Sequence, residues 1–209
     1  MSSFPHVAVV GAGAFGGWTA LRLRERGCRV TLVDAWGPGN ARASSGGETR
    51  ILRGIYGPDR IYVQWVARAF AAWREAERRL NVRLYHPTGA LWICGPGEDA
   101  YVRSSLPLLA EAGLKAAEIG LDEARRRFPQ VSFAGIESVF FEETAGYLMA
   151  RRACRVIAGD FLQAEVSVRE GRVFADGSAL AADVFVFACG PWLGTLFPGL
   201  VRVRPTRQE

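Results

Sequence analysis

The chain has 209 residues, of which 49% are hydrophobic and 22% charged, so it can bury a core and is not predicted to be disordered. Its net charge of +5 comes almost entirely from arginines spread over many segments, because Lys115 is the only lysine. The longest basic run is Arg125–Arg127, so we expect no nucleic-acid partner. No stretch approaches the roughly 18 apolar residues of a membrane span, and the apolar start lacks the basic cluster of a signal peptide.

The four cysteines lie far apart, and none belongs to a CxxC pair: Cys28, Cys94, Cys154 and Cys189. This spacing predicts neither a metal site nor a disulfide framework. Reduced thiols favour a cytoplasmic location.

The start of the chain predicts a strand–helix–strand unit. His6–Val10 is a short apolar run typical of a buried parallel strand. Ala14–Arg26 has a helical pattern that ends at Gly27. Arg29–Val33 is a second apolar strand, which runs into Asp34. A unit of this kind begins the doubly wound α/β folds.

Helical and strand patterns alternate over the rest of the chain. Helices are predicted over Ile61–Leu80, Asp99–Ala112, Leu121–Phe128 and Met149–Phe161. Strands are predicted over Ala90–Cys94, Ser138–Phe141, Glu165–Arg169, Arg172–Ala175 and Val184–Ala188. The last of these is a buried apolar strand that returns to the first domain. We therefore predict an α/β fold: a Rossmann-like nucleotide-binding domain of residues 1–83 and 149–209, with helices on both faces of a parallel sheet, and an inserted α+β substrate domain of residues 84–148.

A GxGxxG motif joins the first strand to the first helix, the context in which this pattern indicates dinucleotide binding. It consists of Gly11, Ala12, Gly13, Ala14, Phe15 and Gly16. Gly11 permits the tight turn, Gly13 lets a pyrophosphate approach the backbone, and Gly16 allows close helix–strand packing. The helix N-terminus offers unpaired N–H groups to phosphates. Asp34 suits ribose hydroxyls and disfavours the 2′-phosphate of NADP. The motif does not separate FAD from NAD.

A second feature is the stretch SSGGETRILRGIYG, residues 44–57, in which small residues precede Arg50 and Arg53 within an apolar run. Together with the GxGxxG motif, Asp34, Phe128-Pro129 and Ala188-Cys189-Gly190-Pro191-Trp192, it resembles the flavin-dependent amine oxidases of the D-amino-acid oxidase superfamily. The similarity is greatest to the branch of monomeric sarcosine oxidase and N-methyltryptophan oxidase. It extends, with gaps, over nearly the whole chain, and GETRxxR is its most specific part.

The resemblance implies FAD as cofactor and a small amine or N-methyl amino acid as substrate, which O2 oxidises to an imine with release of H2O2. It also implies the roles of several residues. Those expected against the flavin are Ser45, Gly46, Gly47, Thr49 and Arg50. Arg53 would bind the substrate carboxylate, and Val166 would touch adenine through its backbone. Ala188 and Gly190 would lie beside the pyrophosphate.

The side-chain chemistry agrees with these roles. Two adjacent glycines let a flavin ring approach the backbone. Arginine binds a carboxylate through two parallel hydrogen bonds, and a cation near the flavin stabilises negative charge on the reduced ring. The alternative for Arg50 and Arg53 is a structural ion pair, with Glu48 as one candidate partner of Arg50. Four aromatic residues are candidates for pocket walls or equally for core packing: Tyr56, Tyr85, Trp92 and Tyr147.

Members of this family are much longer than 209 residues. The segment beyond Glu209 normally carries further substrate contacts, a basic residue that promotes O2 reactivity and a cysteine that can bind FAD covalently. Residues 155–168 are also shorter than in the family. We therefore expect the chain to be the FAD-binding half of an oxidase whose site a C-terminal half completes. An unfinished sheet edge would favour a homo-oligomer.

Three other functions stay open from the sequence. One is an FAD-dependent dehydrogenase of the same fold that uses another electron acceptor. Another is a truncated, non-catalytic nucleotide-binding module. An NAD-dependent dehydrogenase is supported only by the GxGxxG motif and Asp34. The sequence does not name the amine.

Overall fold

The computed structural model describes residues 4–162, 168–170 and 180–206. The chain divides into two compact units, one formed by Met1–Arg50 with Met149–Glu209 and the other by Ile51–Leu148. The first segment of the first unit thus ends at Arg50, whereas the sequence predicted that the first segment of the nucleotide-binding domain ends at residue 83. The reason is that helix α2 (Arg60–Leu80) packs its Val63 into the core of the second unit. Which residues form the substrate domain stays a prediction.

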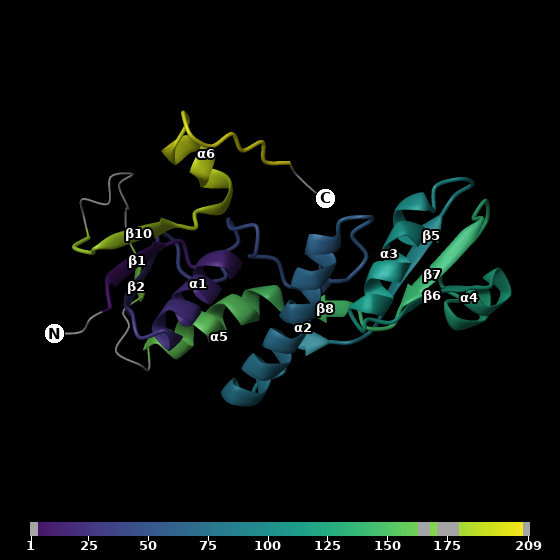
Figure 1. Ribbon diagram of the computed structural model, residues 1–209, viewed down its shortest axis with the longest axis horizontal. Coiled ribbons are helices and arrows are strands. Elements are labelled where there is room, and N and C mark those ends of the chain that lie inside the picture. Colours follow the sequence, from purple (N-terminus) through teal and green to yellow (C-terminus); the bar gives the residue numbers. More distant parts are fainter. Residues whose placement is uncertain (1–3, 163–167, 171–179, 207–209) are drawn as a thin grey trace. The chain divides into compact units, whose positions relative to one another are not determined.

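The first unit contains a sheet of four parallel strands in the order β10–β1–β2–β9, of which Figure 1 labels β10, β1 and β2. Their bounds are β1 His6–Val10, β2 Arg29–Asp34, β9 Val168–Glu170 and β10 Val184–Phe187. In register, Val10 at the end of β1 lies beside Val33 of β2 and Phe187 of β10. Strand β1 is apolar and buried, as expected for an inner strand of a parallel sheet.

The chain order reverses at β1. From β1 the chain passes through helix α1 (Ala14–Glu25) to β2 on one side, while β10 pairs on the other side. In open α/β sheets such a reversal marks the place, at the carboxyl ends of the strands, where ligands bind. This topology confirms the predicted Rossmann-like α/β fold.

Helices α1 and α5 (Ala150–Leu162) pack against each other in the first unit (Figure 1). Gly17 of α1 permits the close contact, because a Cβ there would lie 3.2 Å from Cγ2 of the buried Ile157. A 3₁₀ turn, Gly190–Trp192, and the short helix α6 (Leu193–Leu196) follow β10. Helix α5 therefore positions α1, which carries the GxGxxG motif at its start.

The second unit is α+β, with two small sheets. Strands β5 (Ala90–Cys94), β7 (Ser138–Glu142) and β6 (Ala116–Ile119) form an antiparallel sheet in the order β5–β7–β6. Helix α3 (Ala100–Glu111) packs on this sheet, and α4 (Leu121–Arg127) lies beside β7 (Figure 1). The other sheet contains β3 (Arg50–Leu52), β8 (Gly146–Leu148) and β4 (Tyr85–His86) in the order β3–β8–β4.

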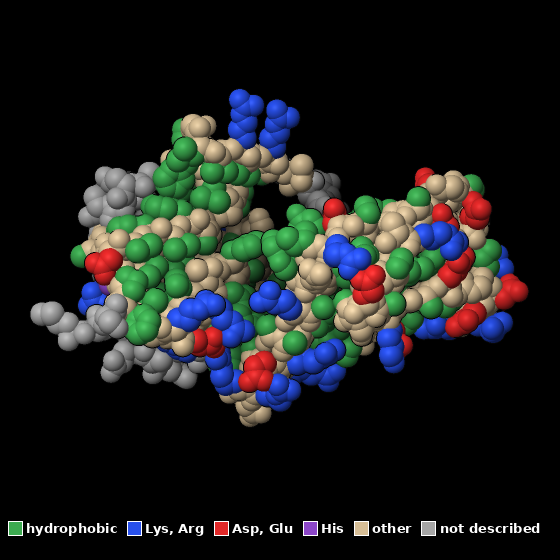
Figure 2. Space-filling model, viewed as in Figure 1, with side chains coloured by type: hydrophobic (Ala, Val, Ile, Leu, Met, Phe, Trp, Pro, Cys, Tyr) green, Lys and Arg blue, Asp and Glu red, His purple; other side chains and the backbone are tan. Residues whose placement is uncertain are grey.

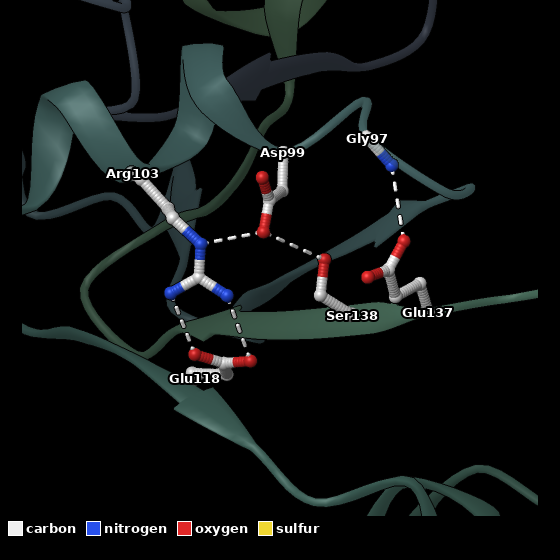
Figure 3. Close-up of polar contacts among 6 residues, drawn as sticks. All are labelled: Gly97, Asp99, Arg103, Glu118, Glu137 and Ser138. Atoms are coloured by element: carbon white, nitrogen blue, oxygen red, sulfur yellow. Dashed lines mark hydrogen bonds and ion pairs between the residues drawn. The ribbon is translucent and has the colours of Figure 1, made fainter.

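A polar network fixes α3 to its sheet (Figure 3). The Arg103 guanidinium donates to both oxygens of Glu118, at 2.8 and 3.0 Å, and also to Asp99 at the start of α3. The same group lies 5.1 Å from the ring centre of Phe140, which is fully buried. Ser138 donates to Asp99 at 3.3 Å. One arginine thus links α3, β6 and β7 through the fork geometry that arginine offers carboxylates.

Charges on the second unit are mixed in sign. On its face drawn in Figure 2, basic and acidic side chains are interspersed rather than gathered. In the described part of the chain, no helix is both long enough and apolar enough to cross a bilayer.

Glu142 is a buried carboxyl group at the end of β7. One of its oxygens accepts the backbone N–H of Gly54, and the other accepts that of Ile55 at 3.4 Å. Burial raises the pKa of Glu142, while these hydrogen bonds, Trp92 and the charge of Arg53 act in the opposite direction. Glu142 thereby ties the segment that follows Arg53 to the sheet.

Replacing Glu142 with Gln tests this buried group through pH. Because the folded-state pKa of Glu142 lies above its ordinary value of 4.5, the folded chain retains a proton that the unfolded chain has already released. Its contribution to the free energy of unfolding is therefore full below that ordinary value and falls as pH rises through the folded-state pKa. We expect the wild type to lose stability relative to Glu142→Gln over this range in urea unfolding.

The exposed neighbour Glu143, replaced with Gln, is the matched control and should show little such change. Wild-type stability that stays constant or rises relative to that of Glu142→Gln between about pH 4 and pH 8 would contradict the assignment.

Candidate functional site

The GxGxxG turn is built from backbone contacts that leave no room for side chains. Gly11 has φ +106°, and a Cβ on it would lie 2.4 Å from the carbonyl oxygen of Ala188. A Cβ on Gly16 would lie 1.7 Å from the Gly11 carbonyl oxygen. The Gly11 N–H donates to the carbonyl oxygen of Val33 at 2.6 Å. The first and third glycines are therefore required by the fold itself, before any ligand binds.

The N-terminus of α1 is open to an anion. Gly13 precedes the helix without a side-chain cap, and the first turn contains no acidic residue. The N–H of Ala14 donates to the Ser45 hydroxyl at 3.3 Å, and a Cβ on Gly13 would lie 3.0 Å from that hydroxyl oxygen. Free backbone donors and a positive dipole end suit a phosphate group. This arrangement fits the pyrophosphate of FAD, with Ser45 at its edge.

Asp34 fixes the glycine turn to the end of β2. Its two carboxylate oxygens accept the backbone N–H groups of Ala12 and Trp36, both at 2.8 Å. Each carboxylate oxygen has a second acceptor position, so these bonds are compatible with the predicted contact to ribose hydroxyls. The first role of Asp34 in the structure is to hold the backbone.

Ala188 and Gly190 lie beside the same turn. The Ala188 N–H donates to the Val10 carbonyl oxygen at 2.7 Å, and the Cys189 thiol donates to that oxygen at 3.4 Å. Burial, with the charge of Asp34, raises the pKa of Cys189 to about 11, so this thiol is not a nucleophile at neutral pH. Gly190 has φ +53° and starts the following 3₁₀ turn.

The Ser44–Arg50 segment forms a second turn in the first unit. A Cβ on Gly46 would lie 1.8 Å from the Asn40 carbonyl oxygen, and one on Gly47 would lie 2.2 Å from Nη1 of Arg50. Gly46 is thus needed for packing within the turn, because its contact is with backbone, whereas the contact at Gly47 is with the end of a side chain that can move. Through Ser45, this turn touches the N-terminus of α1.

Arg50 binds the turn that contains it. Its Nε and Nη2 donate to the Ser44 carbonyl oxygen at 3.2 and 2.5 Å, and its Nη1 donates to that of Thr49 at 2.8 Å. Glu48, a candidate partner of Arg50, instead forms an ion pair with Arg151 at 2.7 Å. The structure therefore gives Arg50 a role in fixing the turn. Its contact with flavin stays a prediction.

Arg53 belongs to the second unit and lies between two aromatic rings. Its guanidinium carbon is 4.7 Å from the ring centre of Tyr56 and 4.9 Å from that of Trp92. Within the described residues its one hydrogen bond is from Nη1 to the Ile55 carbonyl oxygen. The remaining donors of the guanidinium are available to a carboxylate. Two of the four aromatic candidates, Tyr56 and Trp92, thus face a functional candidate.

Two residues that hold the candidate site residues in place were not predicted from the sequence: Glu142 and Arg151. Glu142 ends an apolar strand, and Arg151 lies near the start of a helix, so each has a local pattern that suggests a solvent-exposed charge. Val166, the predicted adenine contact, lies outside the described residues. The groups predicted beside the pyrophosphate and flavin lie together in the first unit, and Arg53 lies in the other unit.

Two curated proteins illustrate what this chain is similar to in sequence. The monomeric sarcosine oxidase of Bacillus sp. (strain B-0618) is 29% identical over 227 residues, which cover 100% of this chain and 57% of that protein. The N-methyl-L-tryptophan oxidase of Yersinia pestis (strain Pestoides F) is 27% identical over 218 residues, covering 96% and 57%. The chain therefore spans about half the length of these curated relatives.

The fold is also similar to that of a solved oxidase. The crystal structure of a modified fructosyl peptide oxidase from Aspergillus nidulans superposes with a TM-score of 0.76 at 23% identity, covering 93% of this chain and 51% of that one. Residues 6–209 match the family described as DAO, FAD dependent oxidoreductase. Because this match extends over nearly the whole sequence, the chain belongs to the DAO family of FAD-dependent oxidoreductases.

Proposed function

We propose that the chain takes part in the oxidation of a small amine or N-methyl amino acid to an imine, with O2 reduced to H2O2. The observation that carries this proposal is the Arg53 guanidinium, held between two aromatic rings with donors left over. Two relatives support the substrate class, because their names refer to sarcosine and N-methyl-L-tryptophan. Both compounds are N-methyl amino acids with a free carboxylate.

FAD, when bound, supplies the two-electron acceptor of such a reaction. The residues that would hold it are those of the two turns in the first unit: Gly11, Ala12, Gly13, Ala14, Phe15, Gly16, Asp34, Ser45, Gly46, Gly47, Thr49, Arg50, Ala188 and Gly190. The backbone N–H groups at the start of α1 would bind the pyrophosphate. The Ser44–Arg50 turn would offer the isoalloxazine a surface without side chains at Gly46 and Gly47.

Arg53 would bind and orient the carboxylate of the substrate. The guanidinium lies over the rings of Tyr56 and Trp92, and these cation–π contacts would help to hold it in one orientation toward a carboxylate. Glu142, which binds the backbone of Gly54 and Ile55, holds the residues that follow Arg53 in place. The chain would thus fix one end of the substrate while the amine end is oxidised.

The function is tested with the purified chain and added FAD. We expect the protein to take up FAD, and the flavin absorbance to fall when sarcosine or another N-methyl amino acid is added without oxygen. Admission of air should restore the absorbance and release H2O2, measured with a peroxidase-coupled assay. Slow reoxidation in air would favour a dehydrogenase with another acceptor. The proposed activity would be contradicted for this chain if the protein binds ADP but neither sarcosine nor any other N-methyl amino acid tested reduces its flavin.

Replacing Arg53 with Met tests the carboxylate contact. Loss of a charge-assisted pair should raise the KM or dissociation constant for an N-methyl amino acid by roughly 10- to 100-fold. FAD affinity should not change, and neither should the response to an amine without a carboxylate. Arg53→Lys keeps the charge without the fork and should recover part of the loss.

The matched control for that variant is Arg50→Met, since Arg50 lies in the same stretch and binds the turn. It should weaken FAD binding more than substrate binding. If Arg53→Met released FAD and left substrate binding unchanged, the two arginines would have been assigned the wrong way round.

Replacing Asp34 with Ala tests the glycine turn. The N–H groups of Ala12 and Trp36 would lose their acceptor, so the FAD dissociation constant, measured by flavin fluorescence, should rise by roughly 10-fold or more. Asp183→Ala is the control, because Asp183 accepts the His6 N–H at 2.7 Å at the opposite, amino-terminal edge of the sheet. Equal losses of FAD affinity in the two variants would show that the effect comes from general loss of stability.

A further inference from the structure

Arg151, the second residue of α5, directs its polar groups to the Ser44–Arg50 turn. Its Nε donates to the Gly46 carbonyl oxygen at 3.0 Å. Its Nη1 pairs with Oε1 of Glu48 at 2.7 Å. Its backbone N–H donates to the Gly47 carbonyl oxygen at 3.1 Å. One residue thus contacts three consecutive residues that lie more than a hundred positions earlier in the chain.

The turn and the start of α5 complete each other. The Ala150 N–H donates to the Glu48 carbonyl oxygen at 3.0 Å, so the first two N–H groups of α5 have their acceptors in this turn. Such groups have no partner within a helix. The preceding loop also closes on Arg151, because a Cβ on Gly39 would lie 2.6 Å from the Arg151 carbonyl oxygen. Arg151 therefore binds the turn with both its side chain and its backbone N–H.

The turn needs such contacts because its own sequence does not fix it. Gly46 and Gly47 are adjacent, and glycine has more conformations to lose than any other residue. Arg50 binds the carbonyl oxygens of Ser44 and Thr49, at the two sides of the glycine pair. Arg151 binds the carbonyl oxygens of the glycine pair itself, Gly46 and Gly47. A turn held in this way before the cofactor arrives pays less of the ordering entropy when the cofactor binds.

We propose that Arg151 is a positioning residue that presets the Ser44–Arg50 turn to receive the flavin ring, acting through Gly46 and Glu48 rather than by touching the cofactor. This inference rests on the proposed function, in which the flavin lies against that turn. Since Glu48 neutralises the guanidinium, the fork geometry of Arg151 matters more than its charge.

The test compares FAD with ADP as ligands of the full chain. ADP would bind the α1 turn and Asp34, whereas the flavin part of FAD would also need the Ser44–Arg50 turn. Arg151→Met should weaken FAD binding roughly 10-fold, as expected for loss of charge-assisted hydrogen bonds, and leave ADP binding unchanged. Arg151→Lys keeps the charge and should recover only part of this loss. Glu48→Gln should give a smaller loss, because the Gly46 contact remains.

Arg152→Met is the matched control, because Arg152 is the exposed next residue of the same helix. It should change neither ligand. Thermal unfolding of each variant shows whether the fold is intact. A fold-wide effect of Arg151→Met would weaken ADP and FAD alike, and that result would overturn the inference.

The two proposals fail in different ways. If wild type binds FAD no more tightly than ADP, the flavin ring makes no contact with the protein, and the proposed placement of the flavin is wrong. If wild type prefers FAD over ADP and Arg151→Met keeps the full preference, the placement stands and the role of Arg151 is refuted.

Discussion

The structure depends on a place where three backbone segments approach each other without side chains between them. The end of β1, the end of β10 and the start of α1 meet at Gly11 and Gly16, where added Cβ atoms would lie 2.4 Å and 1.7 Å from carbonyl oxygens. Side chains at either position would separate the helix from the sheet. The same closeness sets the start of α1 at the carboxyl edge of the sheet, so the packing constraint would also form the predicted phosphate site.

Arginine side chains also fix the backbone, by donating hydrogen bonds to carbonyl oxygens. Arg50 and Arg151 bind carbonyl oxygens of one turn, so their charges order a glycine-rich segment that has little apolar surface to bury. Arg53, three residues after Arg50, is held by aromatic rings and makes one described hydrogen bond. The difference is physical: a cation whose donors are used has a structural role, and a cation with free donors can bind an anion.

The sequence predicted the features that depend on local pattern. The β1–α1–β2 unit follows from apolar runs around GxGxxG, and the VFVF strand was expected to return to the first domain. Strands β3, β4, β6 and β8 were not predicted, because two to four residues are too few to show a clear periodicity. Glu142 and Arg151 were missed because their partners lie 88 and 105 positions away along the chain. Such pairs form only through tertiary packing. The place of α2 in the second unit also depends on tertiary packing.

The most direct test of this account is a crystal structure of the chain with FAD and a small carboxylate. We expect the pyrophosphate at the N-terminus of α1, the isoalloxazine against Gly46 and Gly47, and the carboxylate on the free donors of Arg53. An isoalloxazine bound away from the Ser44–Arg50 turn, or a carboxylate that leaves Arg53 untouched, would contradict the account.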